Sequence, residues 1–211
     1  MAQRFRWGLW GTILGLIVVG GGIALAATRG PKVSYDNVTS PRPVDGNASS
    51  AVVLQEFSDF QCPACGAAYP VVKGLVQTYG DKLRFEYKHF PLTKIHVNAY
   101  QAALASECAN DQGKFWEYHD KLFENQTKLS TADEKQYAQD LGLDTTKFNA
   151  CLDTRAKKSV VDADVSEGNS KKVQGTPTFF LNGKMLQFSS YTELESAVRA
   201  ATGGTKQGPV Q

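Results

Sequence analysis

The chain has 211 residues, and its 23 Lys and Arg against 21 Asp and Glu give a net charge of +2, which leaves no basic surplus for binding nucleic acid. A hydrophobic fraction of 42% is ordinary for a folded core and argues against disorder. Four cysteines are too few for a disulfide-stapled mini-protein, and three histidines leave little material for a metal site, so no metal is expected.

The chain begins with a long apolar run. Residues 7–28 contain no charged side chain and follow Arg4 and Arg6. As a helix, this run would be about 33 Å long, enough to cross a hydrocarbon core of about 30 Å. We therefore predict that residues 1–29 form a membrane anchor that contacts the bilayer through residues 7–28. The alternative is a cleaved secretory signal, because Ala24-Leu25-Ala26 is a small-x-small pattern.

Either reading of the N-terminus places the rest of the chain on the extracytoplasmic side, which is oxidising. The protein is then a single-pass membrane protein, or a secreted or periplasmic one after cleavage. Residues 30–50 are rich in Pro, Ser, Asn and Asp and are predicted to be a linker, and residues 203–211 a flexible tail. The predicted folded body is residues 51–202, a size typical of one domain.

The body begins with a strand, a helix and a second strand. Residues 51–57 (AVVLQEF) form a short apolar run that predicts a buried strand. Apolar residues then recur at helical spacing from Cys62 to Tyr79, and residues 83–89 (LRFEYKH) alternate as a second strand. Short connections between these elements predict a right-handed parallel β-α-β unit.

A block of helices follows, at about residues 93–172. Helices are expected over 97–109 and 115–123, from a capped start at Ser130 to a stop at Gly142, around Phe148 to Leu152, and over 155–172. Strands are expected at 178–181 and 184–188, joined by Asn182-Gly183, a dipeptide typical of two-residue hairpin turns. A capping box from Ser190 to Glu193 predicts the start of the last helix.

The chemistry is expected at Cys62-Pro63-Ala64-Cys65, a CxxC motif between a strand and a helix. The free N–H groups and the dipole of a helix N-terminus favour a thiolate over a thiol, and proline suits the first helical position. A zinc site would need about four ligands, and no second CxxC or CxxH motif is present. A purely structural bridge is the other alternative, although a cysteine pair at a helix start is poorly placed to join distant segments.

Together these segments resemble the thioredoxin superfamily, and specifically the DsbA-like thiol:disulfide oxidoreductases. The resemblance covers essentially the whole body in the family's order, and it is carried by residues 56–65 (EFSDFQCPAC), 89–92 (HFPL), 105–108 (ASEC), 113–116 (GKFW) and 175–180 (GTPTFF). It implies an α/β thioredoxin fold of the form β-α-β … β-β-α, and the block of helices resembles the insert of DsbA-like proteins.

The resemblance also implies roles for individual residues. Cys62 matches the exposed nucleophilic cysteine and Cys65 the resolving cysteine. Thr176 and Pro177 match the family's cis-proline loop, which lies beside the CxxC motif and offers its backbone to an extended substrate. Glu56, six residues before Cys62, matches a buried acid that handles the Cys65 proton; its alternative is an exposed carboxylate at a strand end.

The two residues between the cysteines, Pro63 and Ala64, are expected to contact substrate together with the cis-proline loop. They depart from the Pro-His or Pro-Tyr of well-known members, because alanine brings neither charge nor a hydrogen bond to the thiolate. The other two cysteines, Cys108 and Cys151, lie 43 residues apart at apolar positions of the predicted helical block. We predict a structural disulfide between them; the alternative, a second redox relay, lacks any CxxC-like context.

The sequence therefore predicts an extracytoplasmic enzyme that forms disulfide bonds in exported proteins through a redox-active Cys62–Cys65 disulfide, without a metal or organic cofactor. The expected partners are exported proteins with free thiols and a membrane-embedded thiol oxidase that regenerates the disulfide. One alternative is a reductase or isomerase that uses the same residues. The alternative from another class is a redox-inert binding module or chaperone with the thioredoxin fold.

Overall fold

The structure, a computed structural model, describes residues 42–204. The predicted anchor or signal segment, most of the predicted linker and residues 205–211 lie outside the described residues. Among residues 42–204, no helix is both long and apolar enough to cross a membrane.

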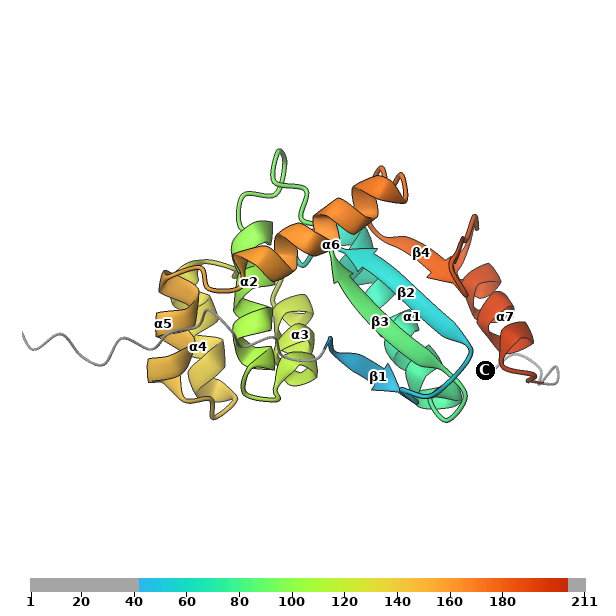
Figure 1. The fold of residues 1–211 in the computed structure, drawn as a ribbon, viewed down its shortest axis with the longest axis horizontal. Helices are drawn as coiled ribbons and strands as arrows, with labels where there is room; N and C mark the ends of the chain where they lie inside the picture. The colour runs from blue at the N-terminus through green and yellow to red at the C-terminus, as the bar shows by residue number, and fades with distance from the viewer. Residues whose placement is uncertain (1–41, 205–211) are drawn as a thin grey trace, which may run out of the picture. The chain divides into compact units, whose positions relative to one another are not determined.

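A five-stranded mixed sheet organises the described part of the chain (Figure 1). Its order is β1-β3-β2-β4-β5, with β2 and β3 parallel and the other neighbouring pairs antiparallel. The strands are β1 (Val44–Gly46), β2 (Val53–Ser58), β3 (Arg84–His89), β4 (Thr178–Leu181) and β5 (Lys184–Met185). The predicted β-α-β unit is thus present, and its two parallel strands lie in the middle of the sheet.

Helices cover both faces of this sheet. Figure 1 shows α1 (Pro63–Tyr79) behind the strands and α6 (Lys158–Ser170) crossing in front of their upper ends, with α7 (Tyr191–Ala201) beside β4. The remaining helices form a block at one side of the sheet: α2 (Ala99–Asn110), α3 (Phe115–Glu124), α4 (Thr131–Asp140) and α5 (Thr145–Asp153). This architecture confirms the predicted α/β fold with an inserted helical block.

The alternation of side chains along β2 decides which of them lie on the α1 face of the sheet and which on the α6 face. Phe57 packs edge-on against Phe90 and Phe180, with ring centroids 6.3 and 5.6 Å away, on the face that α6 covers. Leu54 belongs to the main core under α1. Because successive strand residues point to opposite faces, Glu56 lies on the α1 side, near the start of the helix that carries the CxxC motif.

The structure corrects two details of the sequence prediction. The segment predicted to be a linker, 30–50, includes β1, which pairs antiparallel with β3, so the fold begins before residue 51. The predicted Ser190 capping box is wrong, because the Ser190 side chain makes no cap bond and Glu193 accepts from the Ser189 N–H instead, at 2.9 Å. The capped start at Ser130 is confirmed, with Asp133 completing a reciprocal capping box.

The hairpin between β4 and β5 forms where it was expected, with Asn182 and Gly183 both in the left-handed region at φ 51° and 78°. This conformation is the one that a two-residue hairpin turn of the primed type requires. Strand β5 is shorter than predicted, however, because pairing with β4 ends at Met185 rather than continuing to residue 188.

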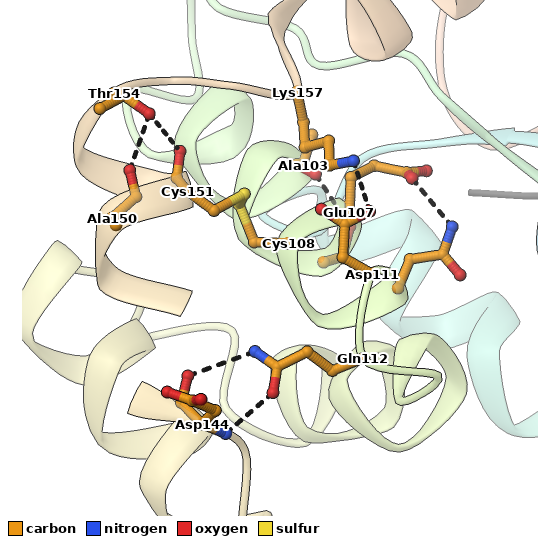
Figure 2. Close-up of a disulfide and its surroundings, with 12 residues drawn as sticks. Ala103, Glu107, Cys108, Asp111, Gln112, Asp144, Ala150, Cys151, Thr154 and Lys157 are labelled. Atoms are coloured by element: carbon orange, nitrogen blue, oxygen red, sulfur yellow. Dashed lines mark hydrogen bonds and ion pairs between the residues drawn. A yellow bond between two sulfur atoms is a disulfide. The ribbon is translucent and has the colours of Figure 1, made fainter. Parts of the chain in front are cut away.

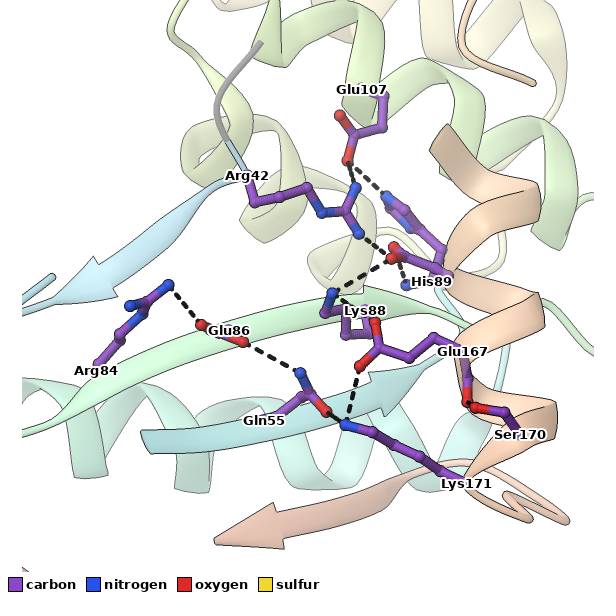
Figure 3. Close-up of polar contacts among 11 residues, drawn as sticks. Arg42, Gln55, Arg84, Glu86, Lys88, His89, Glu107, Glu167, Ser170 and Lys171 are labelled. Atoms are coloured by element: carbon purple, nitrogen blue, oxygen red, sulfur yellow. Dashed lines mark hydrogen bonds and ion pairs between the residues drawn. The ribbon is translucent and has the colours of Figure 1, made fainter. Parts of the chain in front are cut away.

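A buried ionic network joins β1, the sheet and the helical block (Figure 3). The Arg42 guanidinium contacts the carboxylates of Glu107, at 3.4 Å, and Asp164, and His89 Nε2 lies 3.0 Å from the same Glu107 oxygen. Burial raises the pKa of Glu107, but the His89 hydrogen bond and the Arg42 charge more than offset it and hold that pKa below its usual value. The network fixes the segment that enters β1 against the folded body.

Candidate active site

The CxxC motif lies at the connection between β2 and α1. Cys62 is the N-cap of α1, with an extended backbone (φ −75°, ψ 123°) and no side-chain cap bond, and Pro63 begins the helix. The first N–H groups of a helix have no partner within the helix, so they are free to face the Cys62 sulfur. Proline is suited to this position because its missing N–H is one that the helix does not use.

The two cysteines have opposite environments. The structure has the pair as two thiols, and 6% of Cys62 is exposed against none of Cys65. The Cys65 thiol, the Thr176 side chain and the backbone N–H groups of Cys65 and Ala64 stabilise the Cys62 thiolate and lower its pKa to about 5, although desolvation opposes them. Desolvation by burial, the neighbouring Cys62 and the charge of Glu56 raise the pKa of Cys65.

The expectation of an exposed nucleophile needs a correction, because most of the Cys62 surface is covered. The Thr176–Pro177 loop provides part of this cover: its peptide bond is cis, and the Cys62 thiol donates to the Thr176 carbonyl oxygen at 3.4 Å. The Thr176 hydroxyl is buried and has no hydrogen-bond partner among the described residues, which leaves its proton available to a Cys62 thiolate. Of the two cysteines, Cys62 is still the one that solvent reaches.

A groove leads away from the cis-proline loop. It has a volume of about 490 Å³ and lies between β4, the β5–α7 connection and the start of α7. Its lining combines apolar and small polar residues: Pro177, Phe179, Phe188, Ser189, Ser190 and Tyr191 among them. The Tyr191 hydroxyl donates to the Ala64 carbonyl oxygen at 3.2 Å, so the groove reaches the CxxC motif itself.

Glu56 is buried behind the cysteines. It is 3% exposed, which rules out the alternative of a solvated strand-end carboxylate. Burial raises the pKa of Glu56 to about 7, against a hydrogen bond from Ser58 that lowers it. The Ser58 hydroxyl donates to Glu56 Oε1 at 2.6 Å and also interacts with the Cys65 sulfur, so it lies between the acid and the resolving cysteine.

Several side chains at the site were not predicted from the sequence. Asp59 is buried three residues before Cys62 and accepts from the N–H groups of Gln61 and Leu92 at 2.7 and 2.8 Å; its other neighbour is His96 Nδ1, at 2.8 Å. Together they tie the loop after β3 to the CxxC motif. The position of Asp59 within the 56–65 segment was a signal, whereas Leu92 and His96 come together with it only in the fold.

The remaining predicted pair, Cys108 and Cys151, forms a disulfide between α2 and α5, with Cα atoms 5.9 Å apart (Figure 2). Beside it, Gln112 and the Asp144 backbone exchange two hydrogen bonds, of 2.8 and 3.3 Å. The disulfide lies within the helical block, so it joins two insert helices and takes no part in the CxxC site. Among residues 42–204, no cluster of three or more His, Cys, Asp and Glu side chains is arranged to hold a metal ion.

The sequence matches a known family and several curated proteins. A family model described as thioredoxin matches residues 39–200. The Na(+)/H(+) antiporter NhaA 1 of Salinispora arenicola is 39% identical over 175 residues, which cover 82% of this chain and 26% of the antiporter. The chain spans about a quarter of the length of the curated relatives it matches.

Solved structures share the fold. Oxidised BdbD from Bacillus subtilis matches with a TM-score of 0.69 and 24% identity, over 77% of this chain and 94% of BdbD. A thioredoxin-like oxidoreductase from Silicibacter pomeroyi matches with a TM-score of 0.65 and 25% identity, over 78% and 94%. The thiol-disulfide exchange protein alpha-DsbA2 from Wolbachia pipientis matches with a TM-score of 0.67 and 19% identity, over 76% and 87%.

Proposed function

Because the chain belongs to the thioredoxin family, we propose that it is a thiol:disulfide oxidoreductase that forms disulfide bonds through Cys62 and Cys65. The observation that carries the proposal is the position of the Cys62 sulfur, at the N-terminus of α1 and beside the Cys65 thiol and the Thr176 side chain, which lower its pKa to about 5. At pH 7 such a thiol is about 99% thiolate. A stable thiolate is a good leaving group, which favours transfer of the disulfide to a substrate.

The first step begins from the oxidised Cys62–Cys65 pair. A substrate thiolate attacks the Cys62 sulfur, because Cys65 has no exposed surface. The bond between Cys62 and Cys65 breaks, a mixed disulfide forms between the substrate and Cys62, and Cys65 leaves as a thiolate. Because burial raises the pKa of Cys65, this thiolate takes up a proton at once.

The proton comes from Glu56 through Ser58. With Glu56 protonated, its O–H donates to the Ser58 oxygen while the Ser58 O–H donates to the Cys65 sulfur. Transfer of the Glu56 proton to Ser58, and of the Ser58 proton to Cys65, protonates Cys65 and leaves Glu56 as a carboxylate. This carboxylate recovers its proton from solvent. A pKa of about 7 suits Glu56 to both giving and accepting this proton near neutral pH.

The second step releases the product. A second substrate thiolate attacks the substrate sulfur of the mixed disulfide, and Cys62 leaves as its stable thiolate. The substrate has lost two electrons and the protons of two thiols, and the enzyme holds the two electrons as the Cys62 thiolate and the Cys65 thiol. Regeneration needs a thiol oxidase that accepts two electrons. In its carboxylate form Glu56 takes the Cys65 proton through Ser58 and then releases it to solvent.

The proposed location is the extracytoplasmic side of a membrane, with residues 7–28 as anchor or signal. The uncharged apolar run and an oxidising compartment support it, because a disulfide oxidase needs an environment in which disulfides persist. A membrane-embedded oxidase is the proposed partner, since an anchor would keep the two enzymes in the same membrane. Exported proteins with free thiols are the proposed substrates.

Two alternatives use the same fold. A reductase or isomerase would use the same two cysteines with electrons supplied from outside. A reductase would require a less stable Cys62 thiolate, whereas an isomerase begins by attack of that thiolate on a substrate disulfide. A redox-inert binding module would have no use for the opposite environments of Cys62 and Cys65. The lowered pKa of Cys62 therefore favours the oxidase over the reductase.

The test is disulfide transfer to a reduced, unfolded protein. The oxidised wild-type chain should transfer its disulfide, and Cys62→Ser should not. Reduced Cys65→Ser, mixed instead with a protein that contains a disulfide, should accumulate a mixed disulfide through Cys62, because no resolving thiol remains. A Cys108→Ala/Cys151→Ala protein that remains folded is the matched control and should still transfer. Equal activity of Cys62→Ser and wild type would contradict the proposal.

A further inference from the structure

One side chain of the helical insert contacts the backbone of the redox motif. Gln126, in the loop between α3 and α4, donates from Nε2 to the carbonyl oxygens of Phe60 and Cys62, at 2.9 Å each. These carbonyls lie 66 and 64 residues away in the sequence. Two carbonyl acceptors define the orientation of the amide, because only its nitrogen end carries donors.

The fit between Gln126 and the motif depends on Gly66, the residue that follows Cys65. A Cβ atom built on Gly66 would lie 2.1 Å from Gln126 Oε1 and 2.7 Å from its Cδ. The amide therefore occupies the space that any other residue at position 66 would fill with a side chain. Glycine here allows the insert to touch the first turn of α1.

The Cys62 carbonyl is a sensitive place for such a contact. It accepts the first bond of α1, from the Gly66 N–H at 3.1 Å, and Gln126 supplies its second donor. Cys62 has no side-chain cap bond, so this external amide takes part in fixing the peptide at the helix start. The orientation of that peptide decides whether the Cys62 sulfur faces the free N–H groups of the first turn and the Thr176 loop.

We propose that Gln126 is a positioning residue, which holds the Phe60 and Cys62 carbonyls so that the Cys62 sulfur stays over the N-terminus of α1. The helical insert thereby helps to stabilise the Cys62 thiolate through the amide of one side chain. For the redox reaction this inference rests on the proposed function. Its structural content, the stabilisation of the Cys62 thiolate, can be measured without any substrate.

The experiment measures the pKa of Cys62 in the full reduced chain, from the pH dependence of its alkylation by iodoacetamide, with mass spectrometry to identify the site. Gln126→Met keeps the length of the side chain and removes the donors. Gly66→Ala keeps Gln126 but displaces its amide, and alanine favours the helix, so it decides the matter if Gln126→Met does not fold. Gln136→Met is the control, because Gln136 is an exposed amide of α4 that makes a side-chain hydrogen bond to Asp140 and none to the CxxC motif among the described residues.

The pKa of Cys62 should rise by about one unit in both Gln126→Met and Gly66→Ala, which is the size expected for losing hydrogen bonds near a charge. At a pH below the wild-type pKa, this rise lowers the fraction of thiolate about tenfold. Gln136→Met should match the wild type. An acidic Cys62 in the wild type and equally in both variants would overturn the positioning role and leave the proposed function intact. An ordinary pKa of Cys62 in the wild type would overturn both.

Discussion

Replacing Glu56 with glutamine keeps the size of the buried side chain and removes its titration. Burial raises the pKa of Glu56 in the folded protein to about 7, from an ordinary 4.5. Between these values the folded protein holds a proton on Glu56 that the unfolded chain has released. The contribution of Glu56 to stability is therefore fully present below pH 4.5 and is lost as the pH rises to 7. At about 1.4 kcal/mol per pKa unit, the wild type loses about 3 kcal/mol over this range.

Urea unfolding of the oxidised proteins between pH 4 and pH 8 measures this loss, since the oxidised form excludes titration of the CxxC thiols. The free energy of unfolding of the wild type relative to Glu56→Gln should fall by about 3 kcal/mol across the range. Glu195→Gln, at an exposed position of α7, is the control and should follow the wild type. Parallel profiles for wild type and Glu56→Gln would refute the argument that burial keeps this acid protonated.

Three further predictions follow from the described contacts. Glu134→Gln should stabilise the protein at pH 8 by roughly 5 kcal/mol in thermal or urea unfolding, because burial raises the pKa of Glu134 to about 9 and the wild type loses stability as the pH rises from about 4.5 to 9. An unchanged stability would contradict this. Thr176→Val should raise the pKa of Cys62 by up to about one unit in an alkylation titration, because it removes a hydroxyl that helps to stabilise the thiolate. A pKa of Cys62 lower than in the wild type would contradict this role of the hydroxyl. Cys108→Ala/Cys151→Ala should lower the free energy of unfolding by about 4 kcal/mol, the chain-entropy value for closing 43 residues; no loss would mean that the bridge does not constrain the unfolded chain.

Much of the fold was predictable because its signals are local. The strand at 53–58, the helix that Cys62 begins and the turn at Asn182-Gly183 each have a periodicity or a dipeptide that marks them. Strand β1 was not predictable, because three residues, Val44 to Gly46, are too few to show an alternation and their neighbours are polar. Its place comes from pairing with β3 in the folded sheet.

The residues of the site also divide into those that local sequence patterns predict and those that only the fold brings together. The CxxC motif, the Thr176–Pro177 loop and Glu56 follow from the motif and from the family resemblance. The cover over Cys62 and the contact of Gln126 with its carbonyl join residues 114 and 64 positions apart, so no local pattern reports them. Ser58 lies in the resembling segment, but its place between Glu56 and Cys65 becomes visible only when β2 faces α1.

The central claim, that Cys62 and Cys65 form a redox pair poised to oxidise thiols, is tested most directly by the reduction potential of that pair. Equilibration with glutathione buffers, followed by quantification of the reduced and oxidised protein, gives the value. The lowered pKa of Cys62, about 5, predicts a potential above that of thioredoxin and toward the value of about −120 mV of the strong oxidant DsbA. A potential of about −270 mV, the value of thioredoxin, would contradict the oxidase direction. A cysteine pair that does not equilibrate with glutathione would contradict disulfide exchange itself.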